Sequence, residues 1–135
     1  MIIDSHCHLT YEPMSNSLSE TIRRANQDGI KYILTISTED KSYGKILNIV
    51  TKYECVFGTY GIHPHEAKSH QHIKTLDIIE KVNSNKKIIG IGETGLDFYY
   101  NHSDKEDQII SLESHIQAAI ELNIPLIIHS RNAEK

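Results

Sequence analysis

The sequence is poor in cysteine and has no long hydrophobic run. Its two cysteines, Cys7 and Cys55, are too few for a disulfide framework. No stretch approaches the roughly 20 apolar residues that a membrane-spanning helix needs, and an acid, Asp4, stands where a signal peptide needs an apolar core. Basic residues are also in the minority, 14 against 18 acidic residues, which argues against non-specific nucleic-acid binding by a basic face. Together these absences predict a cytoplasmic protein with no membrane partner.

What the sequence does contain is an ordinary globular balance, with 39% hydrophobic and 24% charged residues. A length of 135 residues fits one domain, so we expect residues 1–135 to form a single unit. Nine histidines are many for this length, and several of them follow apolar runs. The histidine positions therefore carry most of the functional information.

Apolar patterns alternate between two periods along the chain. Strand-like runs predict strands near residues 1–5, 31–36, 55–59, 88–91 and 125–129. Helical spacing predicts helices near residues 17–28, 43–50, 76–82 and 105–122. The first helix should begin with a capping box formed by Ser17 and Glu20, and Gly29 should end it. This alternation predicts parallel strands joined by helical crossovers.

The predicted elements amount to part of a larger architecture. Five strands and four helices make about five-eighths of an eight-stranded barrel, which typically needs about 250 residues. The sequence ends six residues after His129, so we expect no helix to cover the fifth strand. The predicted fold class is therefore α/β, with (β/α) repeats of the TIM-barrel type in a parallel sheet. An uncovered last strand also predicts self-association.

A pair of histidines follows the first predicted strand. Because side chains alternate along a strand, His6 and His8 point the same way, about 6–7 Å apart, and Cys7 points the opposite way. Two imidazoles at that spacing can converge on one metal ion, whereas Cys7 is expected to be a packing residue. Asp4 shares the side of the two histidines, where it could orient a ligand. The competing interpretation is a histidine pair that binds no metal.

A carboxylate and another histidine follow two later strands. Glu93 comes after a buried apolar strand, where a lone carboxylate is costly and a cation would offset that cost. His129 ends the fifth predicted strand, so it shares a rim with Glu93 and with His6 and His8. Three imidazoles and a carboxylate suit zinc, manganese or iron better than calcium. The competing interpretation makes Glu93 a solvated loop acid and assigns the nearby glycines to loop geometry alone.

Two further histidines flank Pro64 after the third predicted strand, on the same rim. Proline fixes the backbone between His63 and His65. These two side chains could bind substrate, donate a proton or hold a phosphate oxygen. The remaining histidines are expected to lie outside the site, on the surface or on a helix: His70, His72, His102 and His115.

Four motifs together resemble the TatD family of metal-dependent DNases. They are DSHCH (residues 4–8), GIHPH (61–65), GETGLD (92–97) and HSR (129–131), in the order and spacing of that family. The resemblance runs from residue 2 to the end of the chain and implies an amidohydrolase-like TIM barrel. It also implies hydrolysis of DNA phosphodiesters, including 3′-exonuclease action, with two divalent ions drawn from zinc, manganese, magnesium or iron.

The resemblance also assigns roles to the candidate residues. His6 and His8 would ligate one ion, Glu93 would bridge two ions and take part in catalysis, and His129 would ligate the second ion. His63 and His65 match family positions near the substrate and are further catalytic candidates. These residues supply four of the six ligands that the resemblance implies. The later half of the family's barrel supplies the other two, a histidine and an aspartate.

The expected function is therefore a TatD-like deoxyribonuclease with DNA as substrate, weak or inactive as this chain alone. A second polypeptide that carries the missing half could restore the barrel. Three alternatives stay open: a non-catalytic metal-binding remnant of a split gene, an amidohydrolase that acts on C–N bonds, and a phosphoesterase of the polymerase-and-histidinol-phosphatase type. Amidohydrolases commonly use a modified lysine where Glu93 stands, and the GETGLD segment argues against the phosphoesterase.

Overall fold

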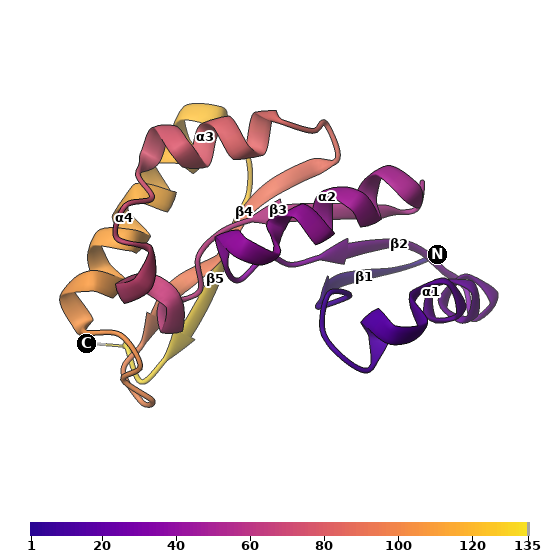
Figure 1. Ribbon diagram of the computed structural model, residues 1–135, viewed down its shortest axis with the longest axis horizontal. Helices are drawn as coiled ribbons and strands as arrows, with labels where there is room; N and C mark the ends of the chain where they lie inside the picture. Colours follow the sequence, from indigo (N-terminus) through magenta and orange to yellow (C-terminus); the bar gives the residue numbers. More distant parts are fainter. Residues whose placement is uncertain (135) are drawn as a thin grey trace.

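The computed structural model describes residues 1–134 and contains a five-stranded parallel sheet (Figure 1). Its strands lie side by side in chain order: β1 (Ile2–Cys7), β2 (Ile30–Thr35), β3 (Val56–Tyr60), β4 (Ile88–Asp97) and β5 (Leu126–Arg131). The α-helices between them are α1 (Leu18–Gln27), α2 (Tyr43–Lys52), α3 (Thr75–Asn83) and α4 (Lys105–Leu122). Short 3-10 helices cover Met14–Ser17, Asp40–Ser42 and Pro64–His70. The predicted α/β half-barrel is confirmed.

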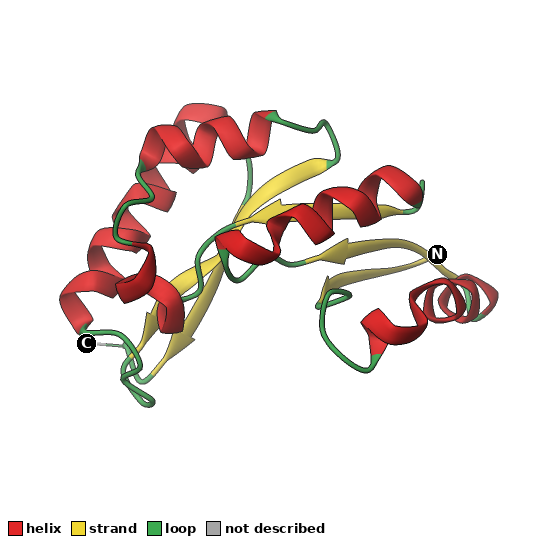
Figure 2. Ribbon diagram, viewed as in Figure 1, coloured by secondary structure: helices red, strands yellow, loops and turns green. Residues whose placement is uncertain are grey.

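The helices follow an arc along the outer side of the sheet, and the core lies between the two layers (Figure 2). Ile46 and Val50 of α2 and Ile78 of α3 are fully buried there, together with Val56 of β3 and Ile91 of β4. On the other side of the sheet, side chains of three strands stay exposed within residues 1–134. They are Ile3 (53%), Tyr32 (46%) and Ile89 (42%). No helix in the described part of the chain is long and apolar enough to span a membrane.

The buried side of α4 agrees only in part with the apolar stripe that helical spacing predicts, Ile109, Leu112, Ile116, Ala119 and Ile120. Ala119 is buried and Leu112 half-buried, but the three isoleucines are exposed, whereas Gln108 and His115 are buried. Both of these polar side chains hydrogen-bond to backbone groups at the carboxyl end of the sheet. Polar anchoring therefore sets the rotation of α4 and leaves most of its isoleucines in solvent.

The predicted capping box at the start of α1 is wrong. Ser17 is the N-cap residue, but its side chain makes no capping hydrogen bond. Because the chain enters α1 from a 3-10 turn, Ser17 lacks the extended backbone that a capping box needs. Glu20 instead pairs with Arg23, with Oε1 2.6 Å from the guanidinium. The end of the helix is as predicted, and Gly29 adopts a φ of +92°.

β4 is longer than predicted, because it continues through Glu93 to Asp97. Gly92 and Gly95 have φ angles of +131° and +143°, and a Cβ atom at either position would collide with the backbone of β5. Glycine therefore permits the close approach of the two strands. Glu93 lies inside this strand and is 9% exposed. The alternative in which it is a solvated loop acid is thus wrong.

Candidate metal centre

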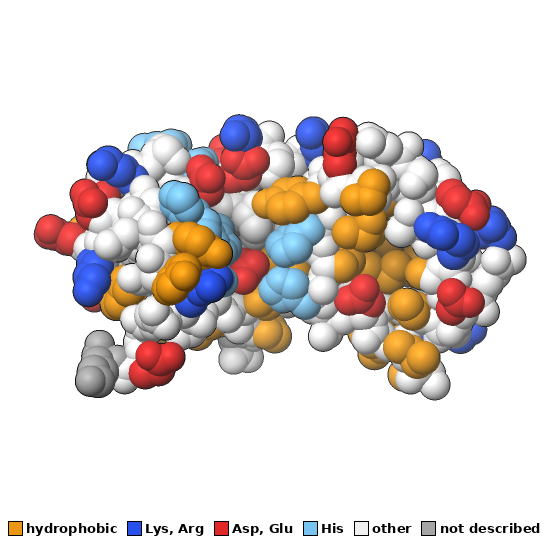
Figure 3. All heavy atoms as spheres, turned by 90° about the horizontal axis from the view of Figure 1, so that it is seen from below, with side chains coloured by type: hydrophobic (Ala, Val, Ile, Leu, Met, Phe, Trp, Pro, Cys, Tyr) orange, Lys and Arg blue, Asp and Glu red, His pale blue; other side chains and the backbone are white. Residues whose placement is uncertain are grey.

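The carboxyl ends of β1, β4 and β5 bring Glu93 together with three predicted ligands. Glu93 Oε2 lies 3.5 Å from His6 Nε2 and 3.9 Å from His8 Nε2. The other oxygen, Oε1, lies 3.3 Å from His129 Nδ1. Figure 3 shows the histidines gathered in the middle of one face, with acidic side chains beside them. The carboxylate therefore stands between the histidines of β1 and the histidine of β5.

Within residues 1–134, the possible ligand atoms form two groups that share Glu93. One group is His6, His8 and Glu93; the other is His63, Glu93 and His129, and the atoms of each group lie within 4.8 Å of one another. A carboxylate as buried as Glu93 costs free energy unless positive charge compensates it. An imidazole-rich donor set suits zinc, manganese or iron. The residues present therefore fit a divalent cation, and Glu93 is common to both groups that could hold one.

A backbone carbonyl fixes the orientation of His8. Its Nδ1 donates a hydrogen bond to the carbonyl oxygen of Ile36 at 3.3 Å, so in the neutral ring Nε2, on the side of Glu93, is the nitrogen with the lone pair. The ring also stacks on Tyr11, with centroids 5.0 Å apart and planes 14° apart. Metal-binding imidazoles are commonly held by such a hydrogen bond from the second ring nitrogen.

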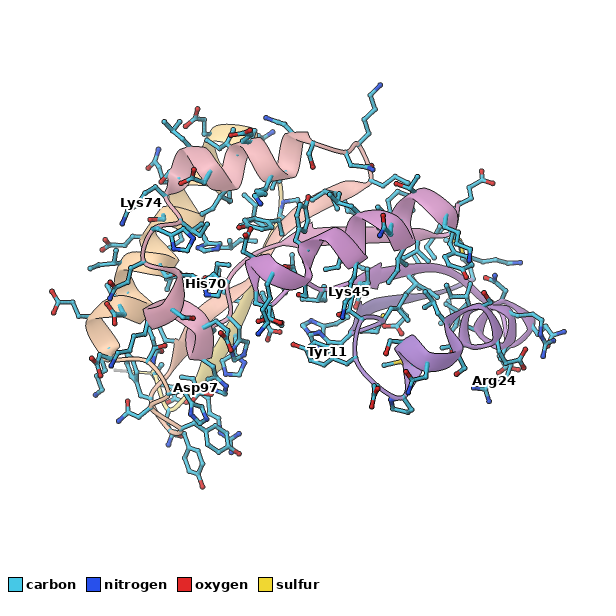
Figure 4. All side chains as sticks on the ribbon, in the orientation of Figure 1. Tyr11, Arg24, Lys45, His70, Lys74 and Asp97 are labelled. Atoms are coloured by element: carbon cyan, nitrogen blue, oxygen red, sulfur yellow. The ribbon has the colours of Figure 1, made fainter. Side chains whose placement is uncertain are left out.

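Asp97 is a site residue that sequence reasoning missed. Its side chain is fully buried and lies near the carboxyl ends of β4 and β5 (Figure 4). Oδ2 accepts hydrogen bonds from Nε2 of His129 at 3.0 Å and Nε2 of His65 at 2.8 Å. Oδ1 accepts the backbone N–H groups of Tyr99 at 3.1 Å and Tyr100 at 3.0 Å. Burial alone would raise the pKa of Asp97, but these four donors outweigh burial and hold that pKa well below its ordinary value.

Asp97 also determines which ring nitrogen of His129 and of His65 remains able to bind a metal ion. Since a carboxylate only accepts hydrogen bonds, Nε2 of His129 carries a proton, and Nδ1, which faces Glu93, is the nitrogen that can bind an ion when the ring is neutral. Nε2 of His65 is engaged in the same way, and His65 belongs to neither ligand group. The sequence did contain one signal for Asp97. It ends the GETGLD segment four residues after Glu93, so in a continuing strand the two side chains would point to the same side.

His63 caps the 3-10 turn that follows β3. Its Nδ1 accepts the backbone N–H of His65 at 3.2 Å, so the proton of the neutral ring is on Nε2. Burial, together with the nearby His129 and His65, lowers the pKa of His63 to about 3. The ring centroids of His63 and His129 lie 4.5 Å apart. His63 is therefore a neutral ring whose one N–H is a donor, and in this tautomer it does not act as a ligand in the group that it forms with Glu93 and His129.

Two polar residues of the DSHCH motif support the fold around the ligands. Cys7 belongs to neither ligand group, and its Sγ donates to the carbonyl oxygen of Leu34. Burial, reinforced by the charge of Asp4, raises the pKa of the Cys7 thiol to about 12. Asp4 accepts the backbone N–H of His6 at 3.1 Å and so orients that ligand through the main chain.

The four histidines expected outside the site have different surroundings. His72 is exposed, as predicted, but His70 is half-buried. His115 is fully buried in α4, where its Nε2 accepts a backbone N–H at 3.1 Å. His102 is exposed, yet its ring lies against that of His65, with centroids 4.6 Å apart. His102 therefore borders the site instead of lying apart from it.

Known proteins resemble this chain in sequence or in structure. A protein of Buchnera aphidicola that is named an uncharacterized metal-dependent hydrolase is 34% identical over 142 residues, which cover 99% of this chain and 54% of that protein. The mouse protein TATDN3, whose name gives deoxyribonuclease as an unproven assignment, is 30% identical, with 98% of this chain and 49% of that protein covered. The crystal structure of YjjV, a TatD homologue from Escherichia coli, superposes with a TM-score of 0.89 at 26% identity, covering 97% and 51% of the two chains.

This chain thus spans about half the length of the relatives it matches. The family described as TatD related DNase matches residues 3–135, nearly the whole chain. The four motifs, the half-barrel and the shared Glu93 all agree with that match. The chain belongs to the TatD-related DNase family.

Proposed function

We propose that this chain supplies the metal-binding part of a hydrolase that cleaves phosphodiester bonds in DNA, including removal of nucleotides from 3′ ends. The proposal rests on the different partners of the two carboxylate oxygens of Glu93: Oε2 faces His6 and His8, and Oε1 faces His129. One carboxylate shared by two ligand groups is typical of hydrolases that use two metal ions. The family description and the name of the mouse relative support DNA as the substrate class.

When bound, divalent ions at such a site neutralise a phosphate and lower the pKa of water toward about 7. The residues of this chain supply the remaining functions. His6, His8 and His129 present ring nitrogens around Glu93, which also compensates the cationic charge. The Nε2–H of His63 is placed to donate a hydrogen bond to a phosphate oxygen. Asp97 holds His65 next to His63, where His65 adds a further polar side chain to the site.

A cleft of about 410 Å³ adjoins these residues and can admit part of a nucleotide. Its walls include His8, His63, His65 and Glu93. The net charge of the protein is −4, so bound cations are the natural means of holding a polyanion here.

The isolated chain is expected to be weak or inactive. One ligand group offers three protein residues, the other offers Glu93 and His129 when His63 acts as a donor, and the relatives are about twice as long. Even an indirect supporting residue of a metal site typically contributes about 10- to 100-fold in metal affinity or activity. A second polypeptide with the remaining strands would cover the exposed side of the sheet around Ile3, Tyr32 and Ile89 and complete the ligand sets.

The experiment compares the wild-type chain with Glu93→Gln and with a matched surface variant, Glu113→Gln on α4. Retained metal is counted after dialysis against manganese or zinc, and 5′-labelled single-stranded DNA is then digested with and without the C-terminal half of a TatD relative. We expect metal retention and slow shortening from the 3′ end in wild type and Glu113→Gln, faster with the added half. The Glu93→Gln variant should neither retain metal nor shorten the DNA. Digestion that survives Glu93→Gln would contradict the proposal.

The same experiment separates the other interpretations. Metal retention with no digestion, even after the complementing half is added, identifies a metal-binding protein without catalysis. Release of an amine from an amide substrate in place of DNA digestion identifies a hydrolase of C–N bonds. The carboxylate of Glu93 already stands between the two ligand groups, so the site has no need of a modified lysine.

A further inference from the structure

A fully buried glutamine on α4 lies next to Asp97, outside both ligand groups. Gln108 is 0% exposed, although glutamine is mostly found on protein surfaces. Figure 1 shows α4 beside the sheet, with its first turns close to the carboxyl ends of β4 and β5. A buried amide costs free energy unless its donors and its acceptor are bonded. The partners of Gln108 therefore indicate why a polar side chain occupies this position.

The amide of Gln108 takes the place of a neighbouring strand at the end of β4. On one side of β4, β5 continues to Arg131, which lies opposite Asp97. On the other side, β3 already ends at Tyr60, opposite Ile91. Oε1 of Gln108 accepts the backbone N–H of Asp97 at 2.7 Å, and Nε2 donates to the carbonyl oxygen of Asp97 at 3.1 Å. The side chain thus supplies both hydrogen bonds that a longer β3 would otherwise make.

Gln108 also connects Asp97 to the 3-10 turn that carries His65. Its Nε2 donates a second hydrogen bond to the carbonyl oxygen of Ser103 at 2.8 Å. Ser103 is 1% exposed, and its hydroxyl donates to the carbonyl oxygen of His65 at 2.9 Å and accepts the backbone N–H of Lys68 at 3.1 Å. These bonds join the end of β4, the segment after it and the turn after β3.

This connection sets a spacing on which both contacts of Asp97 depend. A single oxygen, Oδ2, binds Nε2 of His65 at 2.8 Å and Nε2 of His129 at 3.0 Å. His129 belongs to β5, which pairs directly with β4, so the sheet itself holds this ring near Asp97. His65 lies in a turn outside the sheet. Gln108 and Ser103 therefore link His65 to Asp97 where strand pairing does not.

We propose that Gln108 is a positioning residue of the metal centre. It holds the backbone of Asp97 in place and, through Ser103, holds the turn of His65 at a matching distance. Asp97 then keeps His65 and His129 in the single tautomer in which Nε2 carries the proton. The proposal rests on the proposed function only in treating His129 and Glu93 as metal ligands. Packing alone would accept any side chain of similar size, whereas positioning needs one acceptor and two donors on one planar group.

The test begins with the metal-free chain, so that hydrolysis plays no part. ¹⁵N NMR in mildly alkaline buffer records the imidazole tautomers of wild type and of Gln108→Met, which keeps the size of the side chain but lacks the amide. His65 and His129 should both carry the proton on Nε2 in wild type, and both should become tautomer mixtures in Gln108→Met. Calorimetric titration with manganese should then give an affinity about 10- to 100-fold weaker for Gln108→Met.

Two control variants separate positioning from a general loss of stability. Gln117→Met makes the same replacement at an exposed position of α4 and should leave the tautomers and the affinity unchanged. Tyr43→Phe removes a buried hydrogen bond between α2 and the carbonyl oxygen of Lys81 in α3. It should lower the midpoint of urea unfolding without changing either site measurement.

Ser103→Ala is a smaller change that tests the connection even if Gln108→Met does not fold. It removes only the hydroxyl that bonds to the turn of His65. We expect a tautomer mixture at His65, while His129 keeps its proton on Nε2.

Unchanged tautomers or an unchanged affinity in folded Gln108→Met would overturn the proposal. So would an equal loss of affinity in Tyr43→Phe, or a single His65 tautomer in Ser103→Ala. Failure of the nuclease proposal gives a different result. Altered tautomers and affinity without Glu93-dependent digestion keep the positioning role and reject the nuclease, whereas Glu93-dependent digestion with unaltered tautomers rejects the positioning role alone.

Discussion

Asp97 holds His129 by a 3.0 Å hydrogen bond between Oδ2 and Nε2, on the ring nitrogen opposite the one that faces Glu93. The pair therefore defines the tautomer of a candidate metal ligand through a residue that belongs to neither ligand group. This relationship makes Asp97 as informative a target for mutation as the ligands.

We predict that Asp97→Asn weakens metal binding by about 10- to 100-fold. The amide oxygen would have to accept the N–H groups of Tyr99 and Tyr100, which turns the amide NH₂ toward His129. Nε2 of His129 would then accept, and its proton would move to the nitrogen that faces Glu93. Calorimetric titration with manganese measures the affinity, and ¹⁵N NMR of the imidazoles reports the tautomer. Asp107→Asn, at a surface hydrogen bond to Gln71, is the control; unchanged affinity and tautomer in Asp97→Asn would refute this role.

We predict that His115 makes the protein less stable in mild acid. Burial is the main cause that lowers the pKa of His115 from 6.5 to about 4. Its Nε2 accepts a backbone N–H and its Nδ1 faces the carbonyl oxygen of Ser111, so the folded ring is neutral. Below pH 6.5 the unfolded chain binds a proton that the folded chain excludes, so stability falls as pH decreases toward 4. The loss amounts to at most about 3 kcal/mol at 1.36 kcal/mol per pH unit.

Urea unfolding of wild type and His115→Gln at several pH values between 4 and 8 measures this effect. The difference in the free energy of unfolding between the two proteins should shrink as the pH falls. A difference that stays constant across this range would show that His115 titrates normally in the folded protein.

We predict that Gly95→Ala destabilises the protein by about 2 kcal/mol or more. Gly95 has a φ of +143°, and an added Cβ would collide with the backbone oxygen of His129. Gly44→Ala is the matched control, because a Cβ there meets nothing within 4 Å. On α2 it should stabilise by about 0.5–1 kcal/mol. Chemical denaturation measures both, and equal effects would contradict the close approach of β4 and β5.

We predict that the chain self-associates as its concentration rises. Ile128 on β5 is 58% exposed, and β5 is an edge strand of the sheet. Exposed apolar side chains along an unpaired strand edge favour association between copies. Sedimentation velocity of Ile128→Lys should show weaker association than wild type, whereas Leu76→Lys, at an exposed position of α3, should not. A wild-type chain that remains monomeric at high concentration would refute the prediction.

Element order was predictable because each element has its own apolar period. The strand of residues 31–36 and the helix of residues 105–122 lie within one residue of the observed β2 and α4. The buried side of α4 was not predictable, since periodicity identifies a stripe such as Ile109, Ile116 and Ile120 but not what covers it. Residue type could not reveal Gln108 and His115 as anchors, because their partners are backbone groups of other elements.

The site was predictable as far as strand ends could locate it. His6, His8, Glu93 and His129 follow apolar runs, and parallel strands gather such residues on one rim. Asp97 was not predicted, because its role depends on β4 continuing beyond Glu93. That continuation in turn depends on backbone angles that only glycine adopts readily, and sequence spacing does not encode them.

Two intervening strands, β2 and β3, separate β1 from β4, yet His6 and Glu93 approach to 3.5 Å. Neighbouring strands lie about 4.8 Å apart, so a flat sheet would keep the two backbones about 14 Å apart. The short distance joins two side-chain ends, so the two long side chains reach toward one another across the ends of β2 and β3. An ion held by both residues would bind the folded half-barrel and not the unfolded chain, and would therefore tie the first strand to the fourth and raise the free energy of unfolding.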